Sequence, residues 1–533
     1  MDFYTELAQF NPDPQLEAWV VGTVQTLLAD AEKAAQQIVQ RDASLHAAQL
    51  KIQSLVLELA HLRRMRFGAR SEALSPQMRD LFQETLASDI AAAEAELANK
   101  KTEANSAQPP APRPPRQRAG RQPLPDHLPR IEHRHEPESC TCGQCGADLV
   151  KIGEDVTEQL DVEPAKFFVH RHIRPKYACR PCETIVAEPT PPAIIDGGMA
   201  ATGLFVWILV SKYMDHLPLY RLAQIADRSG VILSISTMSS WVGQLGVALE
   251  PLVDRLIELL KKGDVIHADE TPVKQLDPGS GKTKRAYLWV YRSNNLDTGP
   301  PIVIFDYQTG RSGRYVREFL ADWQGHLMVD DFAGYKALFS ETIFELACMS
   351  HVRRKFFDLN EAQPNPIAQE ALLRIAALYV IEDEAKNMTV AARTEYRLEK
   401  ALPLLKSLHA WLLETRVMVA NGGGTAKALD YALRRWTELI AYASDGHLPI
   451  DNNPVENAIR PIAIGKKNWL FTGSERAGQR AAAIQSLLGT AKLNGLDPAA
   501  WLRETLIKLP TCPHSQIDTL LPFRAEFLNK LAG

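Results

Sequence analysis

The most regular pattern of apolar positions lies near the N-terminus, where hydrophobic residues recur with a heptad period from Val24 to Leu62. Of the twelve a and d positions in this register, eleven are apolar and Arg41 is the exception. A sustained repeat of this kind is typical of a coiled coil or a helical hairpin. We therefore predict a helical, zipper-like region over residues 15–100 that self-associates. The alternative is a long helix packed on its own chain.

A different pattern begins at Val265, where short apolar runs follow one another along the chain. In the first run, β-branched residues lead into acidic ones and Pro272 interrupts, so we expect a buried strand that ends in a carboxylate. Further β-like runs occur at 287–291, 301–305, 326–332 and 344–351. Residues 361–445 are helical in pattern, and helical sequence resumes at Pro454. The pattern predicts a mixed α/β domain interrupted by an all-α block.

Between these two regions, residues 219–242 resemble a helix-turn-helix. Gly230 falls at the turn, and Ser236 or Thr237 could cap the second helix. Such a helix could enter the major groove of DNA, although many helical hairpins share the pattern.

Length and composition narrow the class of protein. A chain of 533 residues is too long for one core, and about three to four domains are expected. With 45% hydrophobic and 23% charged residues, it has the composition of a globular protein. No apolar run approaches the roughly 20 residues that cross a bilayer, and the N-terminus lacks the layout of a signal peptide. We expect a cytoplasmic protein with no membrane contact.

The net charge of -4 does not by itself indicate nucleic acid, but basic residues are concentrated locally. The segment 61–72 carries four arginines at the end of the zipper region. Residues 101–136 hold eight prolines and six arginines, which predicts a basic linker without regular structure that could follow a DNA backbone or act as a spacer. A third concentration follows Glu456, where Arg480 adds a cation for phosphate and Trp469 and Phe471 offer stacking surfaces. For this last segment the alternative is a solvated basic face over two core aromatic residues.

Five of the seven cysteines lie between Cys140 and Cys182. In a cytosolic chain such a cluster indicates a metal site more than disulfides. Two Cys-x-x-Cys pairs, separated by 33 residues, match the needs of a tetrahedral four-cysteine zinc site: Cys142, Cys145, Cys179 and Cys182. Four thiolates leave no open position, so the zinc would be structural. Cys140 is a spare or an alternative first ligand, and buried cysteines without metal are the competing interpretation.

Three carboxylates lie where they could share one edge of the sheet. Asp269 and Asp330 each follow an apolar run, and Glu456 would project from the first turn of a helix capped by Asn453. Clustered carboxylates repel one another unless a cation lies among them. Mg2+ is such a cation, and two Mg2+ ions can stabilise the attacking and leaving oxygens of a phosphoryl transfer. His267 lies on the same strand face as Asp269 and could contact this site or simply pack in the core.

Several motifs closely resemble the insertion-sequence-66 family of bacterial transposases. They cover nearly the whole chain in order, at 66–72, 151–156, 174–179, 211–220, 267–271, 330–335, 350–357 and 452–461. The resemblance implies a leucine-zipper-like N-terminus, a zinc-binding segment, a DDE transposase domain with a ribonuclease-H-like fold, and a short C-terminal family domain.

The family's acidic triad maps by motif onto Asp269, Asp330 and Glu456. The spacings are 61 residues (330 − 269) and 126 residues (456 − 330), and the helical block explains the second as an insertion. Asp331 directly follows Asp330, which leaves the second ligand open between them, although alignment with Tyr335 favours Asp330. Glu270 would point to the opposite face of its strand.

The resulting fold prediction is a multidomain α+β protein with a coiled-coil N-terminus, a small zinc-binding domain and a ribonuclease-H-like α/β catalytic domain with an all-α insertion. The predicted divisions are 15–100 for the zipper region, 101–136 for the linker, 137–190 for the zinc-binding domain, 191–262 for the helix-turn-helix-like segment, 263–484 for the catalytic domain with its insertion at about 361–445, and 485–530 for the C-terminal domain.

The predicted function is a transposase that cuts insertion-element ends and joins them to target DNA. Water activated by metal would cut the end, and the freed 3′ hydroxyl would attack the target. Two Mg2+ ions are expected, with Mn2+ able to substitute, beside the structural Zn2+. His351 is a further candidate for DNA contact, and the other predicted DNA contacts are Arg64, Arg66, Arg70, Arg353, Arg354, Arg460, Lys466, Lys467 and Arg476.

The expected partners are DNA, further copies of the chain and accessory proteins of the same element, in a cytoplasmic, nucleoid-associated setting. Two alternatives stay open. One is an inactive or domesticated DNA-binding relative, and the other is a Mg2+-dependent nuclease that cuts without joining.

Overall fold

The structure is a computed structural model that describes residues 88–98, 128–136, 150–163, 166–179, 182–195, 197–277 and 282–532, with isolated positions before residue 60 and at 124, 126, 147 and 280. The chain forms two units, one of residues 1–65 with 93–119 and one of residues 66–92 with 120–533. In the first unit, the described positions between 51 and 59 are helical, and Leu55 and Leu59 are buried. Most of the heptad register and Arg64, Arg66 and Arg70 lie outside the described residues.

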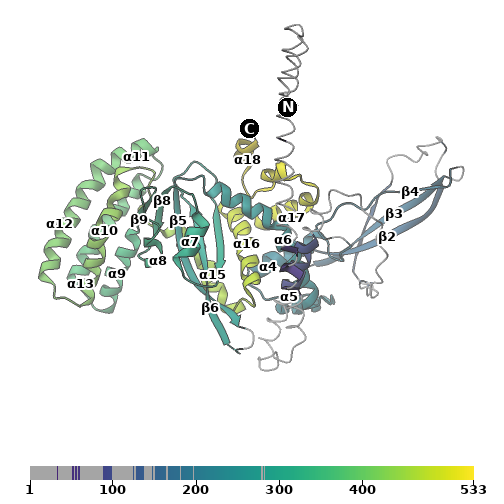
Figure 1. Cartoon of the computed structure of the whole chain (residues 1–533), viewed down its shortest axis with the longest axis horizontal. Helices are drawn as coiled ribbons and strands as arrows, with labels where there is room; N and C mark the ends of the chain where they lie inside the picture. The colour runs from purple at the N-terminus through teal and green to yellow at the C-terminus, as the bar shows by residue number, and fades with distance from the viewer. Residues whose placement is uncertain are drawn as a thin grey trace, which may run out of the picture. The chain divides into compact units, whose positions relative to one another are not determined.

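A five-stranded mixed sheet forms the centre of the second unit (Figure 1). Its spatial order is β7-β6-β5-β8-β9. The first three strands of this sheet in sequence, β5, β6 and β7, pair antiparallel; β8 then pairs parallel with β5, and β9 pairs parallel with β8. Each predicted β-like run is found as a strand, which confirms the mixed α/β prediction: β5 (Val265–Asp277), β6 (Lys282–Ser293), β7 (Val303–Gln308), β8 (Gly325–Val329) and β9 (Ile343–Ala347).

The expectation that the central strand β5 ends before Pro272 was wrong. Pairing with β6 continues to Asp277, whereas the parallel pairing with β8 stops at His267. Pro272 is tolerated because its missing N–H falls on a stretch of strand edge that β8 leaves open. Asp269 therefore lies inside β5 but just beyond the end of the parallel half of the sheet.

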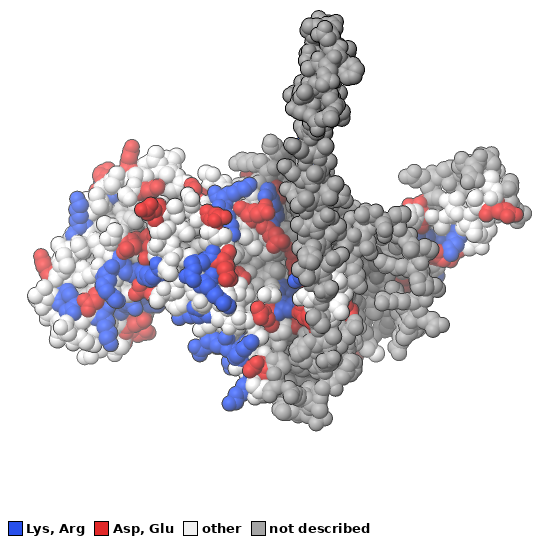
Figure 2. Space-filling model, viewed as in Figure 1, with Lys and Arg blue, Asp and Glu red and all other residues white. Residues whose placement is uncertain are grey.

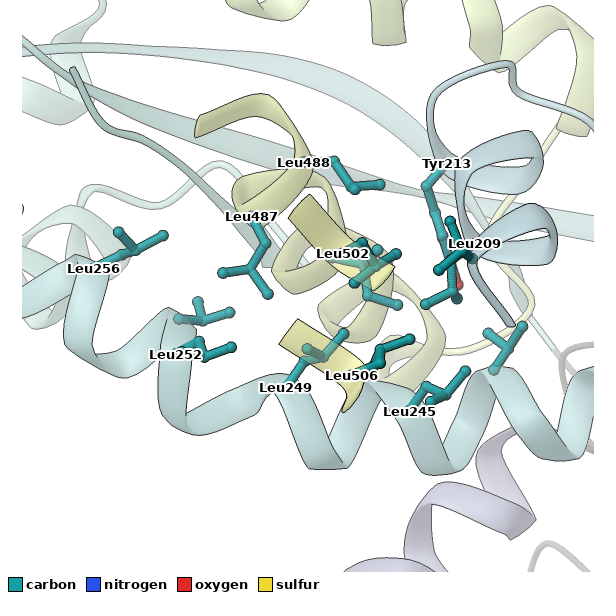
Figure 3. Close-up of a cluster of buried hydrophobic side chains, with 14 of the residues drawn as sticks. Leu209, Tyr213, Leu245, Leu249, Leu252, Leu256, Leu487, Leu488, Leu502 and Leu506 are labelled. Carbon is teal, nitrogen blue, oxygen red and sulfur yellow. The ribbon is translucent and has the colours of Figure 1, made fainter. Parts of the chain in front are cut away.

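One face of the sheet is covered by helices that precede the sheet in the chain and by helices that follow it. Figure 3 shows leucines along α6 (Ile235–Leu260) facing side chains of α4 (Thr202–Tyr213), α16 (Glu475–Leu493) and α17 (Pro498–Lys508). Ile266 and Ala268 of β5 join this core. The edge strand β7 is also covered, because hydroxyl groups of α16 accept its backbone N–H groups: Phe305 to Ser486 at 2.8 Å and Val303 to Thr490 at 3.2 Å. Covering an edge in this way prevents pairing with another chain.

The helix-turn-helix-like segment consists of α5 (Leu219–Asp227) and α6, with Gly230 in the left-handed region at φ 71°. The cap of α6 is Ser234, whose hydroxyl accepts from the Thr237 N–H at 3.0 Å, so the prediction of Ser236 or Thr237 was wrong. Met238, Trp241 and Leu245 are buried in the core described above. The face of α6 that carries these residues is thus packed inside the protein, whereas Ser236 near its start is exposed.

An all-α insertion separates α9 (Met349–Ala362) from α15 (Asn453–Trp469), as predicted. It lies beside the β8–β9 edge of the sheet (Figure 1) and shares an apolar core with β8, β9 and α9. Its elements are α10 (Pro366–Glu384), α11 (Val390–Tyr396), a π-helical turn (Arg397–Ala401), α12 (Leu402–Met418), α13 (Gly424–Arg434), α14 (Trp436–Ile440) and a 3-10 turn (Ala441–Ser444).

The buried side chain of Arg397 ties this insertion together. Its guanidinium forms a two-point ion pair with Glu382 of α10, at 2.8 and 2.6 Å. The remaining Nη1 donates to the carbonyl oxygens of Tyr442, Asp445 and Leu448 at 2.8–2.9 Å. Arg397 thereby joins α10 to the segment that leads into α15.

A smaller sheet precedes the central one and contains β1 (Arg130–Arg134), β2 (Val150–Glu163), β3 (Lys166–Cys179) and β4 (Thr184–Ala187). The linker prediction was wrong at its end, because β1 pairs with β3; the prolines stop at Pro129, and proline restricts only itself and the residue before it. Buried Cys179 ends β3, and half-buried Cys182 lies in the turn to β4. Cys142 and Cys145 lie outside the described residues. Among the helices described, none combines the length and apolar character needed to cross a membrane.

Candidate active site

The three predicted carboxylates come from different elements, and Asp330 and Glu456 both lie near enough to Asp269 for their charges to affect it. Asp269 lies on β5, Asp330 directly follows β8, and Glu456 lies in the first turn of α15. Burial raises the pKa of Asp269 to about 8, and the neighbouring charges of Glu270, Asp330 and Glu456 add to this rise. The carboxylates are therefore close enough to repel one another.

Glu456 is held from two sides by α9. Arg354 Nη2 donates to Glu456 Oε2 at 3.1 Å, and His351 Nδ1 lies 3.7 Å from Glu456 Oε1. Both Glu456 Oε1 and His351 Nδ1 are buried without a hydrogen-bond partner in the described structure. Arg354 thus fixes one carboxylate oxygen and leaves the other directed at the site.

The N-terminus of α15 begins one residue earlier than predicted. Asn452 is its N-cap residue and Asn453 is the first helical residue. The carboxylate of Asp451 accepts from the Asn453 backbone N–H at 3.0 Å and from its side-chain amide at 2.7 Å. The prediction of Asn453 as the cap was wrong because Asp451 supplies the capping oxygen.

His267 supports this helix start. Its Nδ1 lies 2.9 Å from Asn452 Oδ1, and Asn452 Nδ2 donates to the carbonyl oxygen of Ala268 at 2.9 Å. The Asn452 backbone N–H also reaches Cys348 Sγ at 3.2 Å. Burial lowers the pKa of His267 to about 4, so the imidazole is neutral. His267 and Asn452 together join β5, α9 and α15, and they position Glu456 relative to Asp269.

Replacing Asn452 with Ala is expected to lower the free energy of unfolding by about 1–3 kcal/mol, because buried polar partners on His267 and Ala268 lose their hydrogen bonds. The change is read from the urea unfolding midpoint. The exposed Asn457, on the next turn of the same helix, provides a matched Asn457→Ala control with an effect within about 0.5 kcal/mol. Equal effects of the two substitutions would contradict a positioning role for Asn452.

Asp330 and Asp331 have different surroundings. Asp330 Oδ1 accepts the Phe332 N–H at 2.9 Å, and its charge raises the pKa of both Asp269 and Glu270. Asp331 instead lies near cations, 3.6 Å from Lys336 Nζ and 3.9 Å from Arg435 Nε. The geometry favours Asp330 as the partner of Asp269.

Glu270 has its own hydrogen-bond donors, which differ from those of Glu456. The Tyr335 hydroxyl donates to Glu270 Oε2 at 2.8 Å, and Arg311 Nε donates to Oε1 at 2.7 Å. Burial raises the pKa of Glu270, whereas these two donors lower it. Since successive strand residues point to opposite faces, Glu270 lies on the opposite face of β5 from Asp269, as expected.

A groove of about 550 Å³ opens beside Asp330 and His351. Cations from both sides line it: Arg311, Lys355, Lys427 and Arg434. Figure 2 shows Lys and Arg gathered on this face, over the region of α9 and α13 and again over α7 (Gly313–Leu320). The sequence analysis assigned none of these four residues to DNA. Lys355 lies within the 350–357 motif, whereas Lys427 and Arg434 come from the insertion, where no motif marks them.

The predicted DNA contacts within the described residues have varied positions. Arg353, Arg354, Arg460 and Lys467 are exposed, Arg476 is half-buried, and Lys466 donates to the Pro272 carbonyl oxygen at 3.1 Å. Arg480 is buried and paired with Asp89 at 3.1 Å, so its assignment to phosphate was wrong. Phe471 is buried and Trp469 packs on the core of α15, which favours core aromatics over stacking surfaces.

Comparison with known families agrees with this architecture. Residues 197–480 match the family model described as Transposase IS66 family, and residues 139–183 match the zinc-finger binding domain of transposase IS66. Residues 54–132 match a model described as Transposase C of IS166 homeodomain, and residues 486–523 match the IS66 C-terminal element. The chain therefore belongs to the IS66 family of transposases.

Curated relatives extend over almost the whole chain. Uncharacterized protein y4qI of Sinorhizobium fredii is 38% identical over 504 residues, which cover 92% of each protein. Uncharacterized protein y4jD of the same organism is 37% identical over 484 residues, covering 87% of this chain and 93% of the relative.

Proposed function

We propose that this transposase cuts the ends of an insertion element and joins them to target DNA, with Asp269, Asp330 and Glu456 as the catalytic carboxylates. The observation that carries the proposal is that Asp330 and Glu456 lie near enough to the buried Asp269 for their charges to raise its pKa, beside a basic groove. A buried carboxylate with a pKa near 8 and two acidic neighbours is costly for folding, and such groups are concentrated at functional sites.

The donor set fits a hard divalent cation. Carboxylate oxygens are the ligands that Mg2+ prefers, and Glu456 Oε1 is a buried oxygen without a hydrogen-bond partner among the described residues. Two bound Mg2+ ions, or Mn2+ in their place, would supply charge stabilisation at the attacking and leaving oxygens of phosphoryl transfer. Asp269, Asp330 and Glu456 would hold them, and Arg354 and His351 would keep Glu456 in place.

The strand order supports a ribonuclease-H-like fold for this domain. Three antiparallel strands are followed by two parallel ones, and the carboxylates come from the first strand, the end of the fourth and a later helix. We also propose a structural zinc held by Cys142, Cys145, Cys179 and Cys182. The described half of that site fits, since Cys179 ends β3 and Cys182 lies in the turn that leads to β4.

The partner is proposed to be DNA in the bacterial nucleoid. Self-association through the heptad region and a need for accessory proteins of the same element stay predictions. So do the domain limits given above.

The deciding experiment supplies the protein with duplex DNA carrying the element ends, a target plasmid and Mg2+. A transposase yields both nicked ends and joined products. Nicked ends without joined products would favour the nuclease alternative. Specific binding to the ends with neither product, in protein that contains zinc and is fully folded, would favour the inactive DNA-binding relative.

The groove gives a separate prediction about DNA affinity. The double substitution Lys427→Glu with Arg434→Glu is expected to weaken DNA binding by about 10- to 100-fold at physiological salt and to reduce the slope of log K against log salt by about 2, because about two phosphate contacts are lost. Fluorescence anisotropy over a series of salt concentrations measures both quantities.

The matched control is Lys400→Glu with Lys406→Glu, which makes the same charge change at exposed positions of the same insertion that do not line the groove. If the two double variants weaken binding equally, the effect is one of total charge and the groove is not the DNA path.

A further inference from the structure

A second set of potential metal ligands lies directly beside the carboxylates. Cys348 Sγ, one ring nitrogen of His351 and one carboxylate oxygen of Glu456 all lie within 4.8 Å of one another. Cys348 and His351 lie at the start of α9, and Glu456 lies in the first turn of α15. Their chemistry differs from that of the acidic triad, because sulfur and imidazole nitrogen are soft or intermediate donors and Mg2+ binds oxygen.

Two of these ligand atoms have no other role in the described structure. His351 Nδ1 and Glu456 Oε1 are buried, lack hydrogen-bond partners and lie 3.7 Å apart. Leaving buried polar atoms without hydrogen-bond partners destabilises the folded state, and an ion between them would remove that cost. Arg354 does not compete with the ion for Glu456 Oε1, since it donates to the other oxygen, Oε2.

We propose that Cys348, His351 and Glu456 form a site for a soft divalent cation, Zn2+ or Cd2+, distinct from the four-cysteine zinc site. Tetrahedral zinc with ligand distances of about 2.0–2.3 Å needs ligand atoms roughly 3.3–3.7 Å apart, which small side-chain rotations from the present positions would give. An ion can reach the site because His351 lines the groove beside Asp330. The fourth position faces that groove and is left for water.

Occupation of this site would inhibit strand cleavage. Glu456 cannot hold the soft cation and serve the catalytic carboxylate set with the same oxygen, so the two uses compete. This consequence rests on the proposed function, whereas binding of the ion does not.

The binding test uses the full chain purified with its structural zinc. Calorimetric titration with Zn2+ is expected to show one further ion bound by the unsubstituted protein, and Cd2+ is expected to add thiolate-to-metal absorption in the ultraviolet. Cys348→Ser and His351→Gln should each weaken this binding at least about tenfold, since even outer-shell changes at metal sites cost 10- to 100-fold. Cys512→Ser is the control, because Cys512 is a half-buried cysteine outside the cluster, and it should bind like the unsubstituted protein.

The inhibition test measures Mg2+-supported cleavage as Zn2+ is added. Inhibition should need at least about tenfold more Zn2+ in Cys348→Ser than in the Cys512→Ser control. Binding that is unchanged in both the Cys348 and His351 variants would overturn the site. Loss of binding in both variants without any Mg2+-dependent cleavage in the unsubstituted protein would keep the metal site and instead overturn the proposed function.

Discussion

Asp269→Asn protein is expected to lose at least about a thousandfold in the rate of Mg2+-dependent strand cleavage, equivalent to about 4 kcal/mol of transition-state stabilisation. The amide keeps the shape of the side chain but cannot carry the negative charge that would hold the proposed Mg2+. The rate is measured in single-turnover cleavage of labelled element ends, so that product release does not mask the chemical step.

The same substitution is expected to stabilise the metal-free protein. Asp269 has a pKa raised from 3.8 to about 8 in the folded state, so between these values the folded state binds more protons than the unfolded state. Wild-type stability therefore falls as pH rises through this window, and Asp269→Asn protein lacks that loss. The difference should grow from pH 4 to pH 8 and then level off, reaching on the order of 5 kcal/mol in favour of the variant. Added Mg2+ should stabilise only the wild type.

Two isosteric substitutions provide the controls. Glu270→Gln and Asp331→Asn change neighbouring carboxylates that pair with Arg311 and with Lys336 and Arg435, respectively. Each is expected to cost less than about tenfold in cleavage, and Asp330→Asn should match Asp269→Asn. Cleavage that persists in Asp269→Asn, or that depends on Asp331 more than on Asp330, would refute the assigned set of carboxylates.

The strands and the helical block could be predicted because their signals are local. The apolar runs at 301–305 and 326–332 carry β-branched residues between turn residues, and the insertion carries a helical period with no strand pattern. The expectation at Pro272 was wrong for a tertiary reason. Whether a proline ends a strand depends on which edge its missing N–H faces, and that edge is open only because β8 stops at its pairing with His267.

The acidic residues could be identified from the sequence by resemblance, but their supports could not. The hydrogen bond between His267 and Asn452 joins positions 185 residues apart, and no spacing rule connects them. In the sequence, Lys427 and Arg434 look like ordinary exposed residues of a helix. They line the groove only because the insertion packs beside the sheet. The buried pair of Arg480 and Asp89 shows the reverse error, since a basic residue in a basic segment was assigned to DNA although a distant carboxylate neutralises it.

Replacing Arg397 with Met is expected to destabilise the helical insertion by about 3–5 kcal/mol, the cost of removing one partner from a buried ion pair. Arg397 is fully buried, and its loss leaves the carboxylate of Glu382 and three carbonyl oxygens without their donor. Because Leu448 is one of those carbonyl partners, the loosening should extend toward α15 and Glu456. Hydrogen exchange resolved by peptide would then show faster exchange in α10, α11 and the 441–452 segment before it does in β5 and β6.

The companion variants separate the ion pair from general damage to the fold. Lys400 lies in the same π-helical turn, but its side chain is exposed and pairs with its neighbour Glu399. Lys400→Met should therefore change the free energy of unfolding by no more than about 0.5 kcal/mol. Glu382→Leu added to Arg397→Met should recover part of the lost stability, since the unpaired buried charge is then absent. If the double variant is less stable than the single one by the full cost of Glu382→Leu alone, the two side chains do not act as a pair, and the insertion is held by its apolar core without them.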